Sequence, residues 1–180
     1  MTVTPTDLPD VKFVEPRVFT DDRGCFYESW NEAAFAAEGL VATFVQDNHS
    51  RSRRGVLRGL HYQIEHAQGK LVRVVAGEVF DVVVDLRRRS PTFGRSAGMT
   101  LSAQDPRMLW VPPGFAHGFL TLSDHAEFLY KTTDYWSPAH ERTLLWSDPA
   151  LGITWPLTGP PILAAKDAAG TPLALADLYP

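Results

Sequence analysis

Short β-branched runs that end at glycine or proline constrain the fold of this chain more than any other feature. The 180 residues include fourteen prolines and thirteen glycines, which interrupt the apolar runs along the chain. Residues 70–75 and 78–86 are two such runs, and Ala76-Gly77 between them predicts the turn of a hairpin. In the second run Asp81 and Asp85 alternate with valines, so we expect one face of that strand to meet water or a polar cavity. Short apolar runs separated by glycine and proline are typical of all-β sandwiches and barrels.

The other expected elements support the same fold class. One helix is expected at 32–38, because Asn31 can cap its amino end and Gly39 follows its last turn. Antiparallel strands at this spacing predict a double-stranded jelly roll with a few short peripheral helices, and no linker divides residues 1–180 into more than one domain. Further strands are expected at 42–47, 56–63, 97–103, 107–112, 117–121, 126–134 and 142–146.

Composition argues against several classes of partner and location. The formal net charge of −4 does not favour general nucleic-acid binding, and no run approaches the roughly 20 apolar residues of a membrane span. The first residues lack the pattern of a secretory signal. Cys25 is the single cysteine, so no intrachain disulfide can form, and we expect a cytoplasmic protein with neither nucleic-acid nor membrane partners. Cys25 itself is interpreted as a structural residue.

Two motifs are similar to those of the metal-binding cupins, a family of β-barrels, but most metal ligands are replaced. Those motifs are G-x5-H-x-H-x3,4-E-x6-G and P-x-G-x2-H-x3-N. His61 and His117 remain, whereas Gln63 stands at the second histidine position, Lys70 at the acidic position and Thr121 at the asparagine position. A cationic amine among the ligands opposes a divalent ion by Coulomb repulsion. We therefore expect the pocket to persist and to bind neither a metal nor another cofactor.

A base beside a lysine, without a metal, suggests proton abstraction next to a carbonyl group. His61 can accept and return a proton near neutral pH, and Lys70 can stabilise the negative charge of an enolate. Tyr130 is a credible proton donor from the opposite face of a substrate. The ordinary alternatives are a hydrogen-bonded core histidine, a solvated lysine and a packed tyrosine. The carboxylate that orients His61 is left open among Asp81, Asp85 and Asp167.

Phosphate binding would have to come from side chains. The chain has neither a glycine-rich phosphate loop nor a serine nucleophile elbow. Arg23 and Arg58 could each hold a phosphate through two hydrogen bonds, although single arginines are more often surface residues. The clusters at 51–54 and 87–89 are most simply solvated loops.

Several short blocks, in order and at matching spacing, resemble the dTDP-4-dehydrorhamnose 3,5-epimerases. These are cofactor-free cupin jelly-roll enzymes of L-rhamnose nucleotide synthesis, and the resemblance runs from about Phe13 to Asp167. The blocks that carry it are Asp22-Arg23-Gly24, Phe26-Tyr27-Glu28, Gln46-Asp47-Asn48, Arg58-Gly59-Leu60-His61-Tyr62-Gln63, Gly69-Lys70, Ser90-Pro91-Thr92-Phe93-Gly94, Pro112-Pro113-Gly114-Phe115-Ala116-His117-Gly118-Phe119, Tyr130-Lys131-Thr132-Thr133-Asp134-Tyr135 and Ala165-Lys166-Asp167-Ala168-Ala169-Gly170.

The resemblance implies roles for individual residues. His61 is implied as the proton acceptor, Asp167 as the carboxylate that orients it, Tyr130 as the proton donor and Lys70 as the cation near the enolate oxygen. Trp136 stands where the family usually has a tyrosine that stacks on thymine, and a tryptophan offers a larger ring face. The implied substrate-binding residues are Arg23, Phe26, Glu28, Gln46, Asp47, Asn48, Arg58, Lys70, His117, Trp136, Glu141 and Lys166.

The implied reaction inverts C3 and C5 of dTDP-4-dehydro-6-deoxy-D-glucose and yields dTDP-4-dehydro-L-rhamnose. The family also implies a homodimer with exchanged amino-terminal strands, in which Arg23 and Glu28 are expected to serve the partner's site. Three alternatives remain open from the residues alone. They are an antibiotic-sugar enzyme that epimerises one carbon, a metal-dependent cupin enzyme, and a sugar-binding cupin without catalysis.

Overall fold

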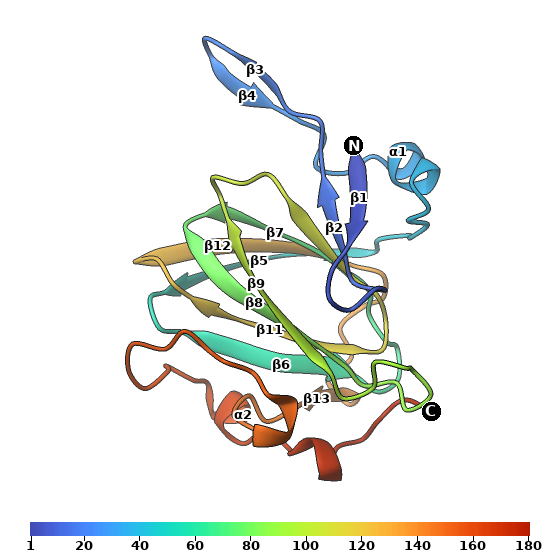
Figure 1. Ribbon diagram of the computed structural model, residues 1–180, viewed down its shortest axis with the longest axis vertical. Helices are drawn as coiled ribbons and strands as arrows, with labels where there is room; N and C mark the ends of the chain where they lie inside the picture. Colours follow the sequence, from blue (N-terminus) through green and yellow to red (C-terminus); the bar gives the residue numbers. More distant parts are fainter.

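Two antiparallel β-sheets face each other in the computed structural model, which describes residues 1–180 (Figure 1). Strands distant in sequence are neighbours in both sheets, which is the predicted jelly-roll topology. In order across the six-stranded sheet lie β1 (Thr2–Pro5), β2 (Lys12–Glu15), β10 (Met108–Val111), β7 (Lys70–Ala76), β12 (His125–Thr132) and β5 (Gln46–Arg53). Across the five-stranded sheet lie β13 (Glu141–Thr143), β6 (Leu57–Gln63), β11 (Phe115–Thr121), β8 (Glu78–Asp85) and β9 (Ser96–Ser102).

The remaining elements are short and lie outside the two sheets. A hairpin of β3 (Phe19–Asp21) and β4 (Gly24–Phe26) projects from the top of the molecule in Figure 1. None of the helices has the length and apolar character of a membrane-spanning segment. The helices are α1 (Glu32–Ala37), α2 (Ala165–Ala168) and the 3-10 turns η1 (Pro149–Leu151) and η2 (Leu173–Leu175).

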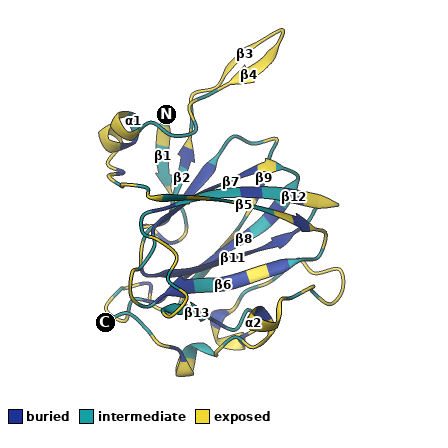
Figure 2. Ribbon diagram, turned by 180° about the vertical axis from the view of Figure 1, so that it is seen from behind, coloured by how far each residue is buried: buried dark blue, intermediate teal, exposed yellow.

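Burial on both faces explains the dense apolar sequence of the central strands (Figure 2). In β8, Val79 and Val83 belong to the core between the sheets. Val82 and Val84 point the other way and pack in a second core with residues of the C-terminal segment such as Leu151. The C-terminal segment therefore covers the outer face of the five-stranded sheet, so that β8 has no solvent-facing side.

The predicted helix is confirmed and its cap explains where it begins. The side chain of Asn31 accepts a hydrogen bond from the N–H of Ala34 at 3.1 Å, and the helix spans Glu32–Ala37. Phe35 is its buried residue, in a third core on the outside of the six-stranded sheet with Leu71 and Met108. One apolar contact face is thus enough to hold this short helix.

Most predicted strands are confirmed, but the prediction of a strand at 42–47 is wrong in its range. The strand β5 begins at Gln46 and continues to Arg53 through a wholly polar sequence. Its alternate side chains Gln46, Asn48 and Ser50 line a polar cavity rather than an apolar core, so the strand carries no hydrophobic alternation. The short strands β1 to β4 were not predicted from the sequence, since they lie at a sheet edge or in the projecting hairpin.

A bulge in β6 changes which side chains face the cavity. His61 pairs with His117 of β11, but Arg58 pairs with Phe119, so two residues of β6 lie opposite Gly118 alone. Arg58 and His61 both line the cavity, although strict alternation over three residues would place them on opposite faces. Gly59, at the bulge, has φ of 119°.

The close approach of β6 and β11 predicts that Gly59→Ala destabilises the fold. A Cβ at Gly59 would lie 2.6 Å from the Cα of Gly118, and its φ is disfavoured for any residue with a side chain. We expect a loss of about 3 kcal/mol in the free energy of unfolding, measured by urea denaturation. Gly159→Ala is the matched control, because no atom outside its two chain neighbours lies within 4 Å of the added methyl group. Equal stability of the two variants would contradict this account of the bulge.

Candidate active site

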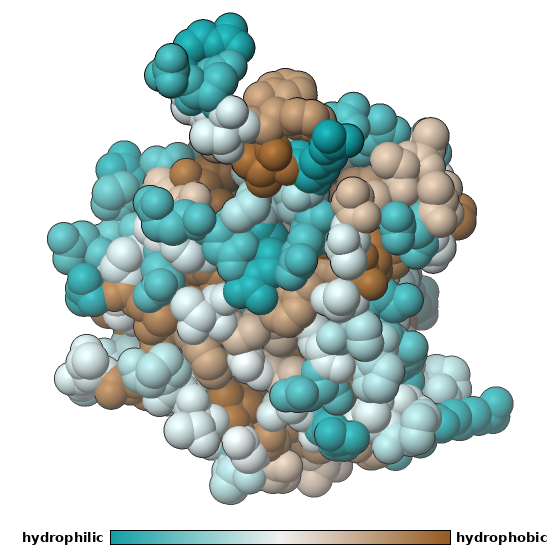
Figure 3. Space-filling view, turned by 45° about the horizontal axis from the view of Figure 1, so that its top comes forward, coloured by the Kyte–Doolittle hydropathy of each residue, from teal (hydrophilic) through white to brown (hydrophobic).

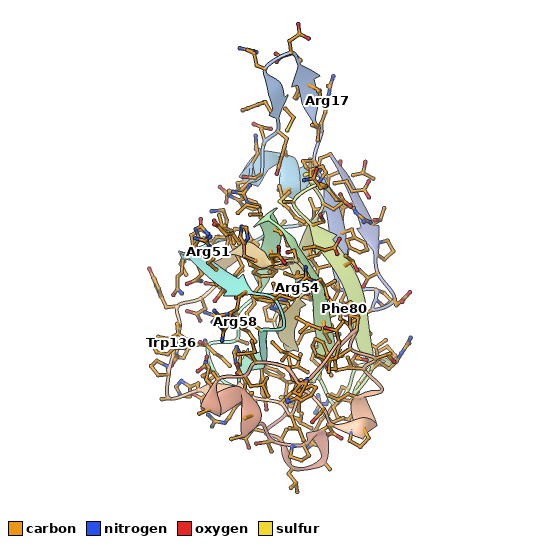
Figure 4. All side chains as sticks on the ribbon, turned by 90° about the vertical axis from the view of Figure 1, so that its left-hand side faces the viewer. Arg17, Arg51, Arg54, Arg58, Phe80 and Trp136 are labelled. Carbon is orange, nitrogen blue, oxygen red and sulfur yellow. The ribbon has the colours of Figure 1, made fainter.

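A cavity of about 390 Å³ lies between the two sheets, in the range of volumes that hold small-molecule ligands. Strands β5, β7 and β12 of one sheet and β6 and β11 of the other contribute to its walls. The segments around Trp136, Glu141 and Lys166 complete its lining. Figure 4 shows Trp136 and Arg58, which line this cavity together, on the same side of the molecule.

His61 and Asp167 form the shortest polar pair in the cavity. The Nε2 atom of His61 lies 2.5 Å from Oδ1 of Asp167. Asp167 belongs to α2 and is 2% exposed, whereas the His61 side chain is 24% exposed toward the cavity. A buried carboxylate of this kind holds an imidazole in one orientation. Of the three carboxylates that the residues alone left open, Asp167, the one that the resemblance implied, is the one that contacts His61.

Asp81 instead pairs with the second histidine. Nε2 of His117 lies 2.9 and 3.0 Å from the two carboxylate oxygens of Asp81, which is fully buried. Burial raises the pKa of Asp81, while His117 and Lys70 act to lower it. Asp85, the third candidate, is bound by Arg87 and by nearby hydroxyl groups outside the cavity.

Lys70 brings a cationic group to a site almost closed to water. The residue is 8% exposed, and its Nζ donates to the backbone carbonyl of His61 at 3.4 Å. Burial lowers the pKa of Lys70 to about 8, although Asp81 and Glu141 act to raise it. Nowhere in the chain do three His, Cys, Asp or Glu side chains form a group that could hold a metal ion.

Tyr130 reaches the cavity from the sheet opposite to His61. It lies on β12 of the six-stranded sheet, whereas His61 lies on β6 of the five-stranded sheet. Burial raises the pKa of Tyr130, and the charge of Glu141 adds to this effect while Arg58 opposes it. The cavity therefore has a proton-bearing phenol on one wall and a carboxylate-paired imidazole on the other.

Polar groups along β5 and at the mouth are arranged for a polar ligand. Nδ2 of Asn48 and Oγ of Ser50 are buried without a hydrogen-bond partner in the chain, and both residues line the cavity. Nζ of Lys166 lies 3.0 Å from both carboxylate oxygens of Glu141. Trp136 is 56% exposed and forms part of the cavity lining.

Four residues that the resemblance implied lie away from this cavity. Arg23 and Phe26 are on the projecting hairpin, where the Arg23 side chain is 90% exposed and Phe26 is 67% exposed. Glu28 follows that hairpin and accepts a hydrogen bond from Asn31 at 3.1 Å. Asp47 points from the other face of β5 and pairs with Lys131 at 2.7 Å. In Figure 3 the hydrophilic tip of the hairpin stands next to exposed apolar surface.

The cavity gathers the other residues expected from the sequence and adds some that were missed. Expected and found in its lining are Gln46, Asn48, Arg58, His61, Lys70, His117, Tyr130, Trp136, Glu141, Lys166 and Asp167. Missed as site residues were Ser50, Gln63, Gln68, Phe119 and Phe128. Strand alternation could have indicated Ser50 from Asn48, and Gln63 from His61.

Comparisons of sequence and comparisons of structure with known proteins point to the same family. A family model described as dTDP-4-dehydrorhamnose 3,5-epimerase matches residues 5–174. The chain is 61% identical to the dTDP-4-dehydrorhamnose 3,5-epimerase of Pseudomonas aeruginosa over 181 aligned residues, covering 100% of both chains. It is similar to the crystal structure of the Legionella pneumophila dTDP-6-deoxy-D-glucose-3,5-epimerase in complex with dTDP-4-keto-L-rhamnose, with 49% identity, a TM-score of 0.95 and coverage of 99% of this chain and 97% of that one.

A relative named for a single epimerisation is also similar. The 3'-monoepimerase of Streptomyces bikiniensis, solved in complex with dTDP-quinovose, shares 35% identity and a TM-score of 0.88. The alignment covers 95% of this chain and 87% of that one. The fold thus occurs in relatives named for one epimerisation as well as in those named for two.

The buried lysine predicts a specific dependence of stability on pH. Between pH 8 and 10.5 the unfolded chain holds a proton on Lys70 that the folded chain has released, because burial lowers the folded pKa to about 8. The free energy of unfolding of the parent should therefore rise with pH in this window, by about 3 kcal/mol relative to Lys70→Met. Urea denaturation of both proteins below pH 8 and at pH 10.5 measures this change.

Lys12→Met serves as the control, since it removes an amine from a position outside the cavity. A difference between parent and Lys70→Met that stays constant over the whole window would show that Lys70 is not desolvated as described.

Proposed function

Because the chain belongs to the dTDP-4-dehydrorhamnose 3,5-epimerase family, we propose that His61 and Tyr130 exchange protons with C3 and C5 of a dTDP-4-keto-6-deoxy sugar. The enzyme is an isomerase that converts dTDP-4-dehydro-6-deoxy-D-glucose into dTDP-4-dehydro-L-rhamnose. The observation that supports these roles is the His61–Asp167 pair on one cavity wall with Tyr130 on the other. An acid and a base on opposite walls are what an inversion at carbon requires.

The chemistry follows from the keto group at C4. This group acidifies the C–H bonds at both C3 and C5, so the same base can act on each carbon in turn. His61 removes the proton, and the electron pair of the C–H bond moves into an enolate with its charge on the former carbonyl oxygen. Tyr130 then donates its proton to the opposite face of the same carbon. Proton exchange with water restores the neutral imidazole and the phenol for the next step.

Lys70 is proposed to stabilise the enolate oxygen. Its Nζ hydrogen bond to the carbonyl of His61 holds a positive charge beside the base. With 8% exposure, the ammonium group acts in surroundings where water screens little, so its interaction with a developing oxyanion is strong. The pKa of about 8 leaves the group mostly charged at neutral pH.

The remaining polar groups are proposed to hold the nucleotide. Arg58 and Lys166 are cavity-lining cations suited to the diphosphate, and Trp136 offers a ring face to the base. Asn48, with its unpaired buried amide nitrogen, is available to a sugar or base oxygen. His117 is proposed as a further contact, oriented by Asp81.

A homodimer with exchanged amino-terminal strands is proposed on the basis of the projecting hairpin. Phe19 and Phe26 on it are 51% and 67% exposed, and apolar surface of this kind marks contact sites between proteins. The exposed Arg23 and the nearby Glu28 would then complete the cavity of the partner subunit. A cytoplasmic location is part of the same proposal, because a single cysteine fits a reducing compartment.

Product formed in deuterium oxide should carry deuterium at both C3 and C5. Each inversion replaces a carbon-bound hydrogen with one from the solvent-exchanged acid, and NMR of the isolated product locates the label. Label at C3 alone would indicate a single-site epimerase, as in the Streptomyces bikiniensis relative named a 3'-monoepimerase. Product without label at either carbon would overturn the proposal.

Two variants separate the roles in this assay. His61→Ala should reduce exchange at both carbons by about 10²- to 10⁴-fold, the usual contribution of a general base. Tyr130→Phe should retain some exchange but lose net inversion, since deprotonation by His61 does not need the phenol. If Tyr130→Phe inverted both centres at the parental rate, the donor would have to be another group.

Complementation between two inactive variants tests the dimer proposal. Arg23→Ala and His61→Ala chains, each inactive alone, should regain roughly a quarter of the parental activity when they are co-expressed in equal amounts. Random pairing makes half of the dimers mixed, and each mixed dimer has one cavity with His61 and the partner's Arg23 both intact. An Arg23 that served its own cavity would give no recovery at all.

A further inference from the structure

Gln63 is a buried cavity residue for which the proposed chemistry has no role. It ends β6, two residues after His61 and on the same strand face, and it is 3% exposed. A buried primary amide needs partners for two N–H groups and one carbonyl oxygen. Gln63 has a partner for each of them, and all of these partners lie in the two loops beside the cavity mouth.

Gln63 forms hydrogen bonds on both sides of Trp136, the residue with the exposed indole ring. Its Nε2 donates to the carbonyl of His66 at 2.7 Å and to the carbonyl of Tyr135 at 3.2 Å. Its Oε1 accepts from the N–H of Ser137 at 2.8 Å. The peptide groups on both sides of Trp136 are therefore bound to one side chain.

A second glutamine holds Trp136 itself. The backbone N–H of Trp136 donates to Oε1 of Gln46 at 3.0 Å. Nε2 of Gln46 donates in turn to Oδ1 of Asn48 at 2.9 Å. The strand β12 ends at Thr132, so no strand ladder supports this loop. Two side-chain amides, one from each sheet, take the place of that ladder.

Gln63 is itself held firmly enough to serve as an anchor. Its backbone pairs with Glu141 of β13, and its backbone carbonyl accepts a hydrogen bond from the hydroxyl of Tyr179 near the C-terminus. The neighbouring His61 has its own partner in Asp167. Loss of the Gln63 side chain therefore leaves the proposed base in place and releases mainly the loop.

We infer that Gln63 is a positioning residue that sets the indole of Trp136 to receive the nucleobase of the substrate. The inference rests on the proposed function for the identity of the ligand. A ring that stacks on a base must hold one orientation, and anchoring the loop in advance removes an entropy cost from binding. Gln63 thus governs affinity for the nucleotide, whereas proton transfer depends on His61 and Tyr130.

Binding of two ligands to Gln63→Met tests the inference. Methionine keeps the volume of glutamine and removes all three hydrogen bonds, so the dissociation constant for dTDP should rise about tenfold. The constant for inorganic pyrophosphate, which has no base, should stay unchanged. Isothermal titration calorimetry gives both values, and Gln104→Met on an exposed turn controls for the substitution itself. In turnover, KM should rise while kcat changes little.

A double-mutant cycle separates positioning from general support of the fold. In a Trp136→Ala background, Gln63→Met should weaken dTDP binding no further, because the two residues act as one unit. If Gln63→Met does not fold, Gln63→Glu keeps the acceptor for Ser137 and replaces only the two donors. Unchanged dTDP affinity, equal weakening of dTDP and pyrophosphate, or full additivity with Trp136→Ala would each overturn the inference. Failure of the proposed function is a separate result, namely a parent enzyme that binds dTDP but incorporates no deuterium.

Discussion

The approach of β6 to β11 at Gly59 and Gly118 is the constraint on which the cavity depends. A Cβ at Gly118 would lie 2.4 Å from the carbonyl oxygen of Arg58, so both positions need glycine for the strands to meet. The extra residue at this point turns Arg58 and His61 to the same side. A cation suited to phosphate and an imidazole suited to proton transfer thereby share one wall, which regular alternation would forbid.

Burial of charge shapes the electrostatics of the same cavity. His61 and His117 lie on neighbouring strands and are each paired with a carboxylate. Burial lowers the pKa of Lys70, another residue of the cavity lining, to about 8. Asp81 and Asp167 each have an imidazole partner, and this hydrogen bond offsets part of the cost of burying each carboxylate. The arrangement gives the cavity a buried amine beside His61, and the raised pKa of Tyr130 leaves its phenol protonated on the opposite wall.

The polar strand β5 and the loops bound by Gln63 are the parts of the site that were not predicted correctly from the sequence. A strand whose inner face lines a polar cavity has no hydrophobic alternation, and β5 was therefore placed four residues too early. The hydrogen bonds of the Gln63 side chain could not be predicted from the sequence either, because its partners His66, Tyr135 and Ser137 are loop residues that only folding brings together. The hairpin with Arg23 lies outside the cavity of its own chain, as expected if it serves a second subunit.

The amino-acid sequence by itself determined the all-β jelly roll, the capped helix at Asn31 and the residue types of the site, because periodicity, capping and motif spacing are local properties of the chain. Without the family resemblance, the residues alone could not choose among Asp81, Asp85 and Asp167 as the partner of His61, because the tertiary structure is what brings a carboxylate distant in sequence to the imidazole. The tertiary structure likewise decided that Arg58 and His61 face one cavity, because a bulge depends on the contact between two strands that are distant in the chain.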